Sequence, residues 1–385
     1  MIQNTQSQGK RIDEDTWKNL IYLSACAVNG KIPEIQKVKS STDKLFSAAR
    51  RHMLAATVGM ALEEAGIRNE IFDQAIAAAQ RKNALLDADR ARVLASLEKA
   101  GIWYMPLKGV LLKDLYPRYG MREMVDNDIL IDPEHRNDVR RIMEDLGFVT
   151  KLYEDNNHDV YHKKPVSSFE MHVYLVNGRS NDALLTYYLN IKDRLLKDKE
   201  NQYGYHFSDN DFYLFLMAHE YKHYVEGGTG LRSLLDIYVY LKQKQKNLDW
   251  NYIQMEIQKM DIANFEKVNK ALAMHLFEGE NLSTSEEEML EYIISSGAYG
   301  TIENDTANQI NKAGGRLKFA LSRITLTHEE MLNEYPVLQK APWLYPVMWV
   351  WRFIRMFFIN HKYFMYQLKA ALGIVTPPKG KPSDH

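Results

Sequence analysis

Apolar residues recur at helical spacing over about the first hundred residues of the chain. Intervals of three and four residues place such side chains on one face of an amphipathic helix. Gly30 can end the first of these helices, and Ser41 and Thr42 can cap a second one that extends to about Gly66. A third run, rich in Ala, Leu, Arg and Lys, continues to Gly101. The pattern therefore predicts a helical N-terminal region.

The period changes after Gly101. Four short runs are apolar or alternate between polar and apolar residues, which is typical of strands, and they cover residues 102–105, 125–131, 159–162 and 168–176. Two helical patterns lie among them, at 110–116 and at 133–146. Pro133 fits the first turn of the second helix, and Gly147 fits its C-terminal cap. These elements predict a compact α/β unit.

Helical patterns return after the last of these strands. They predict helices at 208–224 and 231–242, whereas the polar, glycine-containing segment 297–315 predicts a mobile connection. We therefore expect an α+β fold, in which a small mixed β-sheet core is flanked by N-terminal and larger C-terminal helical regions. The expected parts are a helical region 1–95, a core 96–178 and a helical region 179–385.

Composition narrows the class of protein. The chain carries 49 Lys and Arg against 50 Asp and Glu, so it has no global basic field that would favour nucleic acid. A single cysteine, Cys26, excludes an intrachain disulfide framework and a cysteine-ligated zinc site, and it fits a reducing compartment. The polar first residues lack the apolar segment of a signal peptide. The uncharged stretch 343–351 is too short to span a bilayer, so we expect a cytoplasmic protein without a transmembrane segment.

Two carboxylates lie two residues apart on the predicted strand 125–131. Because side chains alternate along a strand, Asp126 and Asp128 are expected to point to the same face. Carboxylate oxygens are the ligands that hard cations such as Mg²⁺ or Mn²⁺ prefer. A third carboxylate should come from a neighbouring strand, where Glu170 in SSFEMHVYL is the best-placed candidate. We predict that these three acids bind metal and are catalytic.

A lysine–glycine pair precedes this strand at a predicted strand-to-helix turn. Backbone N–H groups at such a turn can hold phosphate. Lys108 and Arg122 would add the positive charge that the tail of an NTP requires. We therefore predict that Lys108, Gly109 and Arg122 bind phosphate. A pair of metal ions beside them would support in-line phosphoryl chemistry, because one ion activates a hydroxyl and the other neutralises the leaving pyrophosphate.

Three runs of sequence, LKGVLLKDLYP, MREMVDNDILI and FEMHVYL, resemble the uncharacterised nucleotidyltransferase family of the DNA polymerase beta-like superfamily. The likeness is strong over about 100–175 and looser at the later HEYKH and LRSLLDIY. It implies a nucleotidyltransferase core, with Lys108 and Gly109 at the turn and the three acids as metal ligands. It also implies transfer of a nucleoside monophosphate from an NTP to a hydroxyl acceptor, with release of pyrophosphate. The sequence does not specify whether the acceptor is a protein, a sugar or a nucleic acid.

The chain departs from the superfamily's pattern at three positions. The turn is Lys108-Gly109 rather than the usual Gly-Gly or Gly-Ser, which leaves the mode of phosphate binding open. Asn127 stands between the aspartates where an apolar residue is usual, and it would cost only packing if it faces away from the site. The third acid is Glu170 rather than the commoner Asp, and its extra methylene changes the metal geometry without forbidding binding.

Two other classes of function remain open. His219, Glu220 and His223 match the H-E-x-x-H motif of zinc metallopeptidases. Lys222 argues against this interpretation because it places a cation inside the motif, and no further histidine motif follows. These histidines can instead form hydrogen bonds within the helical region or line the substrate cleft. The other alternative is a non-catalytic nucleotide-binding module on the same fold.

Several further residues have both a functional and a structural interpretation. His172 is either a neighbour of the active site or a hydrogen-bonded strand histidine. Arg232 and Asp236 are four apart on a predicted helix, so they can form an ion pair or lie near the nucleotide. The C-terminal aromatic residues are most simply core packing, and the alternative is an amphipathic helix at a membrane surface. These aromatic residues are Trp349, Trp351, Phe353, Phe357 and Phe358.

Overall fold

The computed structural model describes residues 13–154, 157–176, 181–324, 328, 331, 335, 337–358 and 361–375. Two compact units share these residues. The first comprises Met1–Lys222 and Gly230–Ala298, and the second comprises His223–Thr229 and Tyr299–Ser383. The boundaries that we expect from sequence near residues 95 and 178 both fall inside the first unit.

The N-terminal part of the first unit is helical, as predicted. It contains α1 (Glu14–Asn29), η1 (Ile35–Lys37), α2 (Thr42–Arg51), α3 (Ala55–Glu64) and α4 (Glu70–Ala100). Asp13 caps α1 by accepting a hydrogen bond from the backbone N–H of Thr16, and Gly30 ends the helix with a φ of 62°. Gly101 ends α4 in the same way, with a φ of 73°.

The prediction of one helix from Ser41 to Gly66 is wrong, because the chain turns between α2 and α3. Met53 has a φ of 56° at this turn, a left-handed conformation that interrupts a helix. His52 is fully buried beside it, and its Nδ1 accepts a hydrogen bond of 3.2 Å from the backbone N–H of Leu231, the first residue of α9 (Leu231–Lys244). The break is therefore fixed by a contact with a distant part of the chain.

A five-stranded sheet of order β1-β2-β5-β4-β3 forms the centre of the unit. Its strands are β1 (Tyr104–Pro106), β2 (Asn127–Ile131), β3 (Val149–Leu152), β4 (His158–Lys163) and β5 (Ser167–His172). β2 and β5 run parallel, and the other neighbours are antiparallel, so the sheet is mixed as expected. The pattern did not predict β3, an edge strand with an irregular register.

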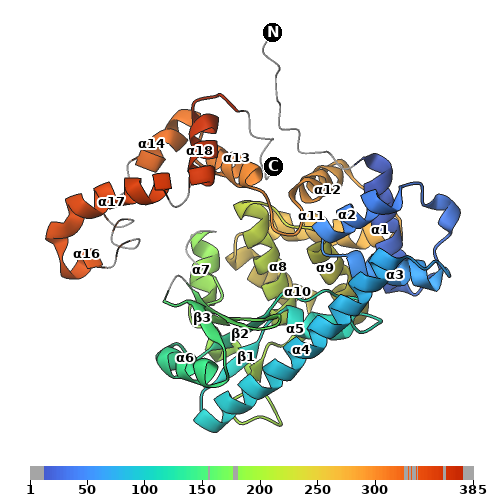
Figure 1. Ribbon diagram of the computed structural model, residues 1–385, viewed down its shortest axis with the longest axis horizontal. Helices are drawn as coiled ribbons and strands as arrows, with labels where there is room; N and C mark the ends of the chain where they lie inside the picture. Colours follow the sequence, from blue (N-terminus) through green and yellow to red (C-terminus); the bar gives the residue numbers. More distant parts are fainter. Residues whose placement is uncertain are drawn as a thin grey trace. The chain divides into compact units, whose positions relative to one another are not determined.

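One face of the sheet packs against two helices (Figure 1), α4 and α6 (Arg136–Asp145). Its buried apolar residues include Ile129, Ile131, Phe169, Met171 and Tyr161 from the strands, with Val93 and Leu97 from α4 and Val139 and Met143 from α6. Side chains alternate along a strand, so the residues between these point to the opposite face. That opposite face carries the polar residues of the candidate site.

Short elements connect the strands. The helix predicted at 110–116 is one turn of α5 (Gly109–Leu112) followed by η2 (Lys113–Leu115), and the helix predicted at 133–146 is η3 (Pro133–His135) followed by α6. Beyond the sheet lie α7 (Asp182–Tyr188), η4 (Ile191–Arg194) and a two-stranded sheet of β6 (Leu196–Lys197) and β7 (Tyr205–His206).

Helices dominate the rest of the chain. The predictions at 208–224 and 231–242 are confirmed as α8 (Asp209–Glu226) and α9 (Leu231–Lys244). The first unit continues with η5 (Gln245–Asn247), α10 (Trp250–Lys259), α11 (Ala263–Glu278) and α12 (Thr284–Ser296). Within the described residues, the second unit contains α13 (Ile302–Lys312), α14 (Arg316–Ile324), α16 (Val337–Lys340), η6 (Pro342–Leu344), α17 (Tyr345–Phe358) and α18 (His361–Ala371).

The prediction of a mobile connection over residues 297–315 is wrong, because this segment contains α13. Thr301 caps the helix, and its side chain accepts a hydrogen bond of 3.1 Å from the backbone N–H of Asn304. The buried side chains of α13 are mostly small or polar, which explains why hydrophobic periodicity did not reveal the helix.

The aromatic stretch near the C-terminus divides between two environments. Trp349 packs against the buried Met331, Tyr335 and Leu338, as expected for core packing, whereas Trp351 is 47% exposed. The side chains of Phe353, Phe357 and Phe358 lie outside the described residues. Contact with a membrane surface stays a prediction. No helix in the described part of the chain is both long and apolar enough to span a bilayer.

Candidate active site

The pairing of β2 with β5 brings two of the predicted acids together. In the parallel register Asp128 is the partner of Glu170, and Leu130 is the partner of His172. Asp128, Glu170 and His172 therefore lie on the sheet face that α4 and α6 leave uncovered. Their oxygen and nitrogen atoms lie within 4.8 Å of one another, a spacing that could hold a metal ion.

His172 sits between the two carboxylates. Its Nε2 lies 3.0 Å from Asp128 Oδ1 and 3.5 Å from Glu170 Oε2. A second histidine, His158 on β4, approaches the same glutamate, with Nε2 3.8 Å from Glu170 Oε2. His172 is therefore hydrogen-bonded on its strand and also adjoins the predicted acids. Its role in an active site stays a prediction.

The lysine–glycine turn lies directly beside Asp128. The backbone N–H of Leu107 donates to the carbonyl of Asp128 at 2.9 Å, which joins the end of β1 to β2. Lys108 follows with φ 20° and ψ −92°, a combination that side-chain-bearing residues rarely adopt. This bend places Lys108 Nζ 3.3 Å from Asp128 Oδ2. Each oxygen of Asp128 therefore has a positively charged or protonatable neighbour.

Gly109 is required for space rather than for its backbone angles. A Cβ atom at this position would lie 2.9 Å from Arg122 Nη1 and 3.1 Å from Met124 Cε, closer than such atoms pack. The absence of a side chain lets the bend approach the segment that leads into β2. The unusual backbone conformation itself lies one residue earlier, at Lys108.

Arg122 is held by a buried ion pair. Its Nε and Nη2 donate to Asp236 Oδ1 and Oδ2, each at 2.8 Å, and the hydroxyl of Tyr116 donates to Asp236 Oδ1 at 2.7 Å. Arg122 and Asp236 are only 7% and 6% exposed. This bidentate pair fixes the segment before β2 to α9. Phosphate binding by Arg122 stays a prediction.

Asn127 anchors β2 from the other side. The residue is completely buried, its Nδ2 donates to the carbonyl of Leu86 on α4 at 3.1 Å, and its Oδ1 accepts from Arg90 Nη1 at 3.0 Å. The departure from an apolar residue therefore adds two hydrogen bonds between β2 and α4. Since neighbouring strand residues point in opposite directions, Asn127 directs Asp128 toward the uncovered face.

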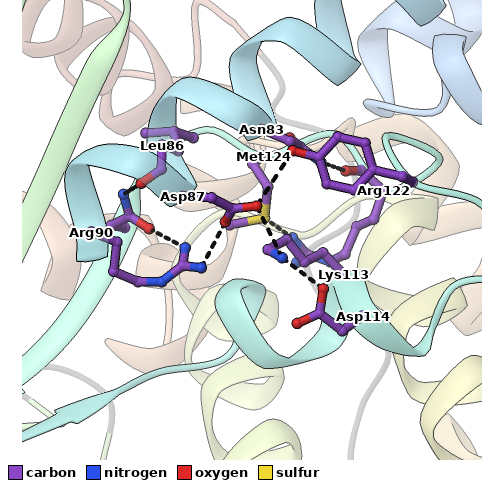
Figure 2. A network of polar contacts seen from close by, with 10 residues as sticks. Asn83, Leu86, Asp87, Arg90, Lys113, Asp114, Arg122 and Met124 are labelled. Carbon is purple, nitrogen blue, oxygen red and sulfur yellow. Dashed lines mark hydrogen bonds and ion pairs between the residues drawn. The ribbon is translucent and has the colours of Figure 1, made fainter. Parts of the chain in front are cut away.

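The contacts of Asn127 belong to a larger polar network (Figure 2). Asp87 Oδ1 accepts from Arg90 at 2.6 Å, and Asp87 Oδ2 lies 3.3 Å from Lys113 Nζ. Asn83 extends the network by donating to the carbonyl of Arg122 at 3.1 Å. The network joins α4, η2 and the segment before β2, so the predicted acids rest on a rigid support.

A cavity of about 90 Å³ opens between these elements, and polar side chains dominate its lining. The lining consists of Lys108, Gly109, Leu112, Arg122, Met124, Val125, Asp126, Asp128, Leu216, His219, Glu220, Arg232, Ser233, Asp236 and Ile237. All predicted phosphate-binding residues and two of the three predicted acids are present. Glu170 lies beside Asp128 rather than in this lining.

Residues 39–278 match the family described as an uncharacterised nucleotidyltransferase, and this range exceeds half of the chain. The chain belongs to this family. The match confirms the resemblance seen in the sequence and supports nucleotidyl transfer as the general function. Searches of curated proteins and of solved structures found no match. The segment shared with the nucleotidyltransferase family runs from just before α2 to the end of α11.

The pKa values of the two aspartates in this candidate site shift in opposite directions. Burial raises the pKa of Asp126 to about 7, and the negative charge of Asp128 adds to the shift. Burial would also raise the pKa of Asp128, but Lys108 and the hydrogen bond from His172 outweigh it and hold that pKa well below its ordinary value. At Asp126, unlike at Asp128, the effects of burial and of the neighbouring carboxylate on the pKa are not outweighed by nearby cations.

His172 links the remaining groups. Its hydrogen bond lowers the pKa of Glu170 despite the burial of that carboxyl group. Burial alone would lower the pKa of His172, but the hydrogen bonds to Asp128 and Glu170 outweigh burial and raise it. A raised pKa favours the protonated imidazole, which would compensate negative charge where the two carboxylates meet.

The zinc-peptidase motif lies on α8 and only partly borders the candidate site. His219 and Glu220 on α8 line the cavity, and His223 is not among the lining residues that the structure describes. Among the described residues, the one group of three His, Cys, Asp or Glu side chains spaced for a metal ion consists of Asp128, Glu170 and His172. The position of potential metal ligands therefore favours the sheet over the H-E-x-x-H motif.

Sequence reasoning missed two residues near the acids. His158 reaches Glu170 from β4, and an alternating His-x-Val-x-His pattern along that strand was the available signal. Lys82 on α4 interacts electrostatically with Asp126. No local pattern marks Lys82, because its position depends on how the long α4 crosses the sheet. Arg232, by contrast, was predicted as a neighbour; it lines the cavity and donates to the carbonyl of Glu123 at 3.2 Å.

Proposed function

We propose that the protein is a Mg²⁺-dependent nucleotidyltransferase, with Mn²⁺ as an alternative ion. It moves a nucleoside monophosphate from an NTP to a hydroxyl acceptor and releases pyrophosphate. The observation that carries this proposal is the juxtaposition of Asp128 and Glu170 across β2 and β5, with Asp126 on the adjoining cavity wall. Family membership supports the reaction class.

The donor set fits a hard divalent ion. Asp126, Asp128 and Glu170 offer carboxylate oxygens, which are the ligands that Mg²⁺ selects. Burial and the charge of Asp128 raise the pKa of Asp126 to about 7, although Lys108 and Arg232 act in the opposite direction, so a divalent ion would favour its ionised form. When bound, the metal ions would activate the acceptor hydroxyl and neutralise charge on the triphosphate.

The chain's own residues position the reactants. The Lys108–Gly109 bend borders the cavity, so we infer that Lys108 turns from Asp128 toward the triphosphate, and Arg232 adds positive charge nearby. Arg122, locked by Asp236, holds the bend in place and faces the same space. One of the carboxylates accepts the proton of the acceptor hydroxyl. The cavity of about 90 Å³ has room for ions and phosphate oxygens, so the base and ribose would lie outside it.

An assay with α-labelled NTP tests the proposal. Purified protein, MgCl₂ and labelled ATP, CTP, GTP or UTP are incubated with protein, glycan and nucleic-acid acceptors, and transfer is measured together with pyrophosphate release. We expect transfer by the wild type and none by Asp128→Asn. Asp138→Asn is a matched control, because Asp138 is a half-exposed carboxylate on α6 that forms an ion pair with Arg141, away from the candidate site.

Two outcomes would contradict the enzyme assignment. Equal transfer by the wild type and Asp128→Asn would show that the carboxylates are not involved. Tight binding of NTP by the wild type, without transfer to any acceptor and without release of pyrophosphate, would favour the non-catalytic nucleotide-binding module.

A further inference from the structure

A second, larger opening adjoins the candidate active site. It is a groove of about 770 Å³, and its lining combines basic side chains with aliphatic ones. The lining consists of Lys82, Val125, Gly147, Val149, Lys151, His162, Lys163, Lys164, Pro165, Val166, Ser167 and Ser168. We call this feature the lysine groove. Its volume falls in the range of about 300–1,000 Å³ that is typical of small-molecule sites.

Strand register connects the lysine groove to the predicted acids. On β5, Ser168 precedes Glu170 by two residues, which is about 7 Å along the strand and on the same face of the sheet. Across the sheet Ser168 pairs with His162, and His162 pairs with Val149. The groove floor therefore continues the face that carries Glu170, toward the turn between β4 and β5.

The other wall of the lysine groove reaches Asp126. Val125 lines both the groove and the smaller cavity, so the two openings meet where the chain enters β2. Lys82 projects from α4 into this wall and interacts electrostatically with Asp126. A compound bound against Val125 and Ser168 would therefore lie one residue along the chain from Asp126 and two residues along β5 from Glu170.

The charged residues that line the lysine groove are all basic. Four lysines and a histidine line it, and none of its lining residues is acidic. Lys163 is compensated, since its Nζ lies 3.1 Å from Asp89 Oδ1. Among the described residues, no carboxylate is recorded within ion-pair distance of Lys82, Lys151 or Lys164. Lys151 and Lys164 therefore offer uncompensated positive charge, whereas Lys82 interacts with Asp126.

The lining also indicates what kind of anion fits. It contains no Phe, Tyr or Trp, the side chains on which the bases of single-stranded nucleic acids stack. Its apolar residues are the aliphatic Val125, Val149, Pro165 and Val166. Lysine amines bind phosphate as point charges. A compact phosphorylated compound therefore matches the groove better than a nucleic-acid strand does.

We propose that the lysine groove binds the acceptor and that this acceptor is a hydroxyl compound bearing a phosphate monoester. The proposal rests on the nucleotidyltransferase function and adds the substrate class. The acceptor oxygen bonds to the α-phosphorus of the NTP, and the bond from that phosphorus to the bridging oxygen of pyrophosphate breaks. The hydroxyl proton passes to a carboxylate of the site. The acceptor's own phosphate stays unchanged against Lys151 and Lys164.

Binding to the loaded protein provides the first test. The protein is saturated with Mg²⁺ and a non-hydrolysable NTP analogue, and glycerol 3-phosphate, ribose 5-phosphate, glycerol and ribose are titrated calorimetrically. We expect the phosphorylated compounds to bind and their unphosphorylated counterparts not to bind. The double variant Lys151→Ala/Lys164→Ala should weaken this binding about tenfold, since each exposed charge contributes modestly.

A matched double variant controls for net charge. Lys246 and Lys267 are exposed lysines outside the groove, so Lys246→Ala/Lys267→Ala removes the same charge elsewhere. It should bind the phosphorylated probes like the wild type. The affinity for the NTP analogue should be equal in all three proteins, because its triphosphate occupies the smaller cavity and its base and ribose do not contact Lys151 or Lys164 in this proposal. A loss of NTP affinity in Lys151→Ala/Lys164→Ala would instead assign the groove to the nucleotide and overturn the proposal.

A transfer assay distinguishes failure of the lysine-groove proposal from failure of the nucleotidyltransferase function on which it rests. With α-labelled NTP, phosphorylated acceptors should be modified in preference to their unphosphorylated counterparts, and Lys151→Ala/Lys164→Ala should raise KM for the acceptor with little change in kcat. Transfer that ignores the phosphate group would refute the lysine-groove proposal and leave the nucleotidyltransferase function intact. Transfer only to an oligonucleotide, sensitive to the same lysines, would also refute the assigned class. Failure of all transfer and NTP binding would refute both.

Discussion

The two sides of β2 differ in the partners of their buried polar side chains. On the side facing α4, Asn127 has both ends of its amide hydrogen-bonded, and Arg90, Asp87 and Lys113 extend the network. On the opposite side, Asp128 and Glu170 lie together with Asp126 close by, and burial and Asp128 raise the pKa of Asp126 to about 7. One side satisfies its polar groups within the chain, whereas the other gathers three carboxyl groups beside Lys108 and His172. The first side supplies stability, and the second is suited to a ligand.

The largest expected effect concerns catalysis on the acidic side. Asp128→Asn and Glu170→Gln each remove a predicted metal-binding carboxylate, so we expect the rate of nucleotidyl transfer to fall by about 10³-fold. The fold should persist because neither side chain belongs to the network around Asn127. Initial rates with α-labelled NTP and far-UV circular dichroism provide the measurement. Retention of more than a tenth of the wild-type rate would contradict the assigned role.

The next effect concerns stability on the opposite side. Asn127→Leu would leave the Leu86 carbonyl and the Arg90 guanidinium without their shared partner. The free energy of unfolding should fall by about 2–4 kcal/mol, because buried polar groups would lose their hydrogen bonds. Urea denaturation measures this change. Asn247→Leu, at an exposed position, serves as the control and should alter stability by no more than about 0.5 kcal/mol.

Replacement of Asp126 should have the opposite effect on stability: it should raise the free energy of unfolding. Burial, with Asp128, raises the pKa of Asp126 in the folded protein to about 7, against 3.8 for the ordinary carboxyl. The folded state therefore binds the extra proton, and stability falls as pH rises from about 4 to about 7. In metal-free protein at pH 8, Asp126→Asn should raise the free energy of unfolding by about 1–2 kcal/mol.

The gain from Asp126→Asn should largely disappear near pH 4, where the carboxyl is protonated in the folded wild type and partly so in the unfolded one. Denaturation curves at several pH values, in the presence of EDTA, measure the difference. Asp138→Asn is again the control. A pH-independent gain would show that Asp126 is not affected by its neighbours in the predicted way.

The smallest effect is stabilisation by the ion itself. At five times its dissociation constant, Mg²⁺ should raise the free energy of unfolding of the wild type by about 1 kcal/mol, since only the folded protein presents the assembled carboxylates. Asp126→Asn and Glu170→Gln should reduce this gain. Thermal unfolding with increasing MgCl₂ provides the measurement. An identical response in all variants would indicate binding elsewhere.

The sequence was sufficient for the parts of the site that depend on local rules. Alternation along a strand predicted that Asp126 and Asp128 point to the same face, and both line the smaller cavity. The resemblance to the family singled out Glu170. The same two-residue spacing brings His172 onto that face. The resemblance also identified the bend at Lys108-Gly109, although it could not reveal that Gly109 makes room for Arg122.

The parts that escaped prediction depend on contacts between distant segments. His52 and Met53 separate α2 from α3 because His52 packs against the start of α9. β3 is a four-residue edge strand with an irregular register, so its alternation is weak. Lys82 reaches Asp126 through the crossing of α4 over the sheet. None of these features has a local signature in the sequence.

The pairing of Lys108 and His172 with the two oxygens of Asp128 has a consequence for the order of events. A divalent ion that binds Asp128 would compete with the Lys108 ammonium and the His172 imidazole for its oxygens, and both groups are tethered to the site. A triphosphate offers Lys108 a new anionic partner and arrives with an ion of its own. Nucleotide and metal would then bind together, and the protein without nucleotide would bind divalent ions more weakly.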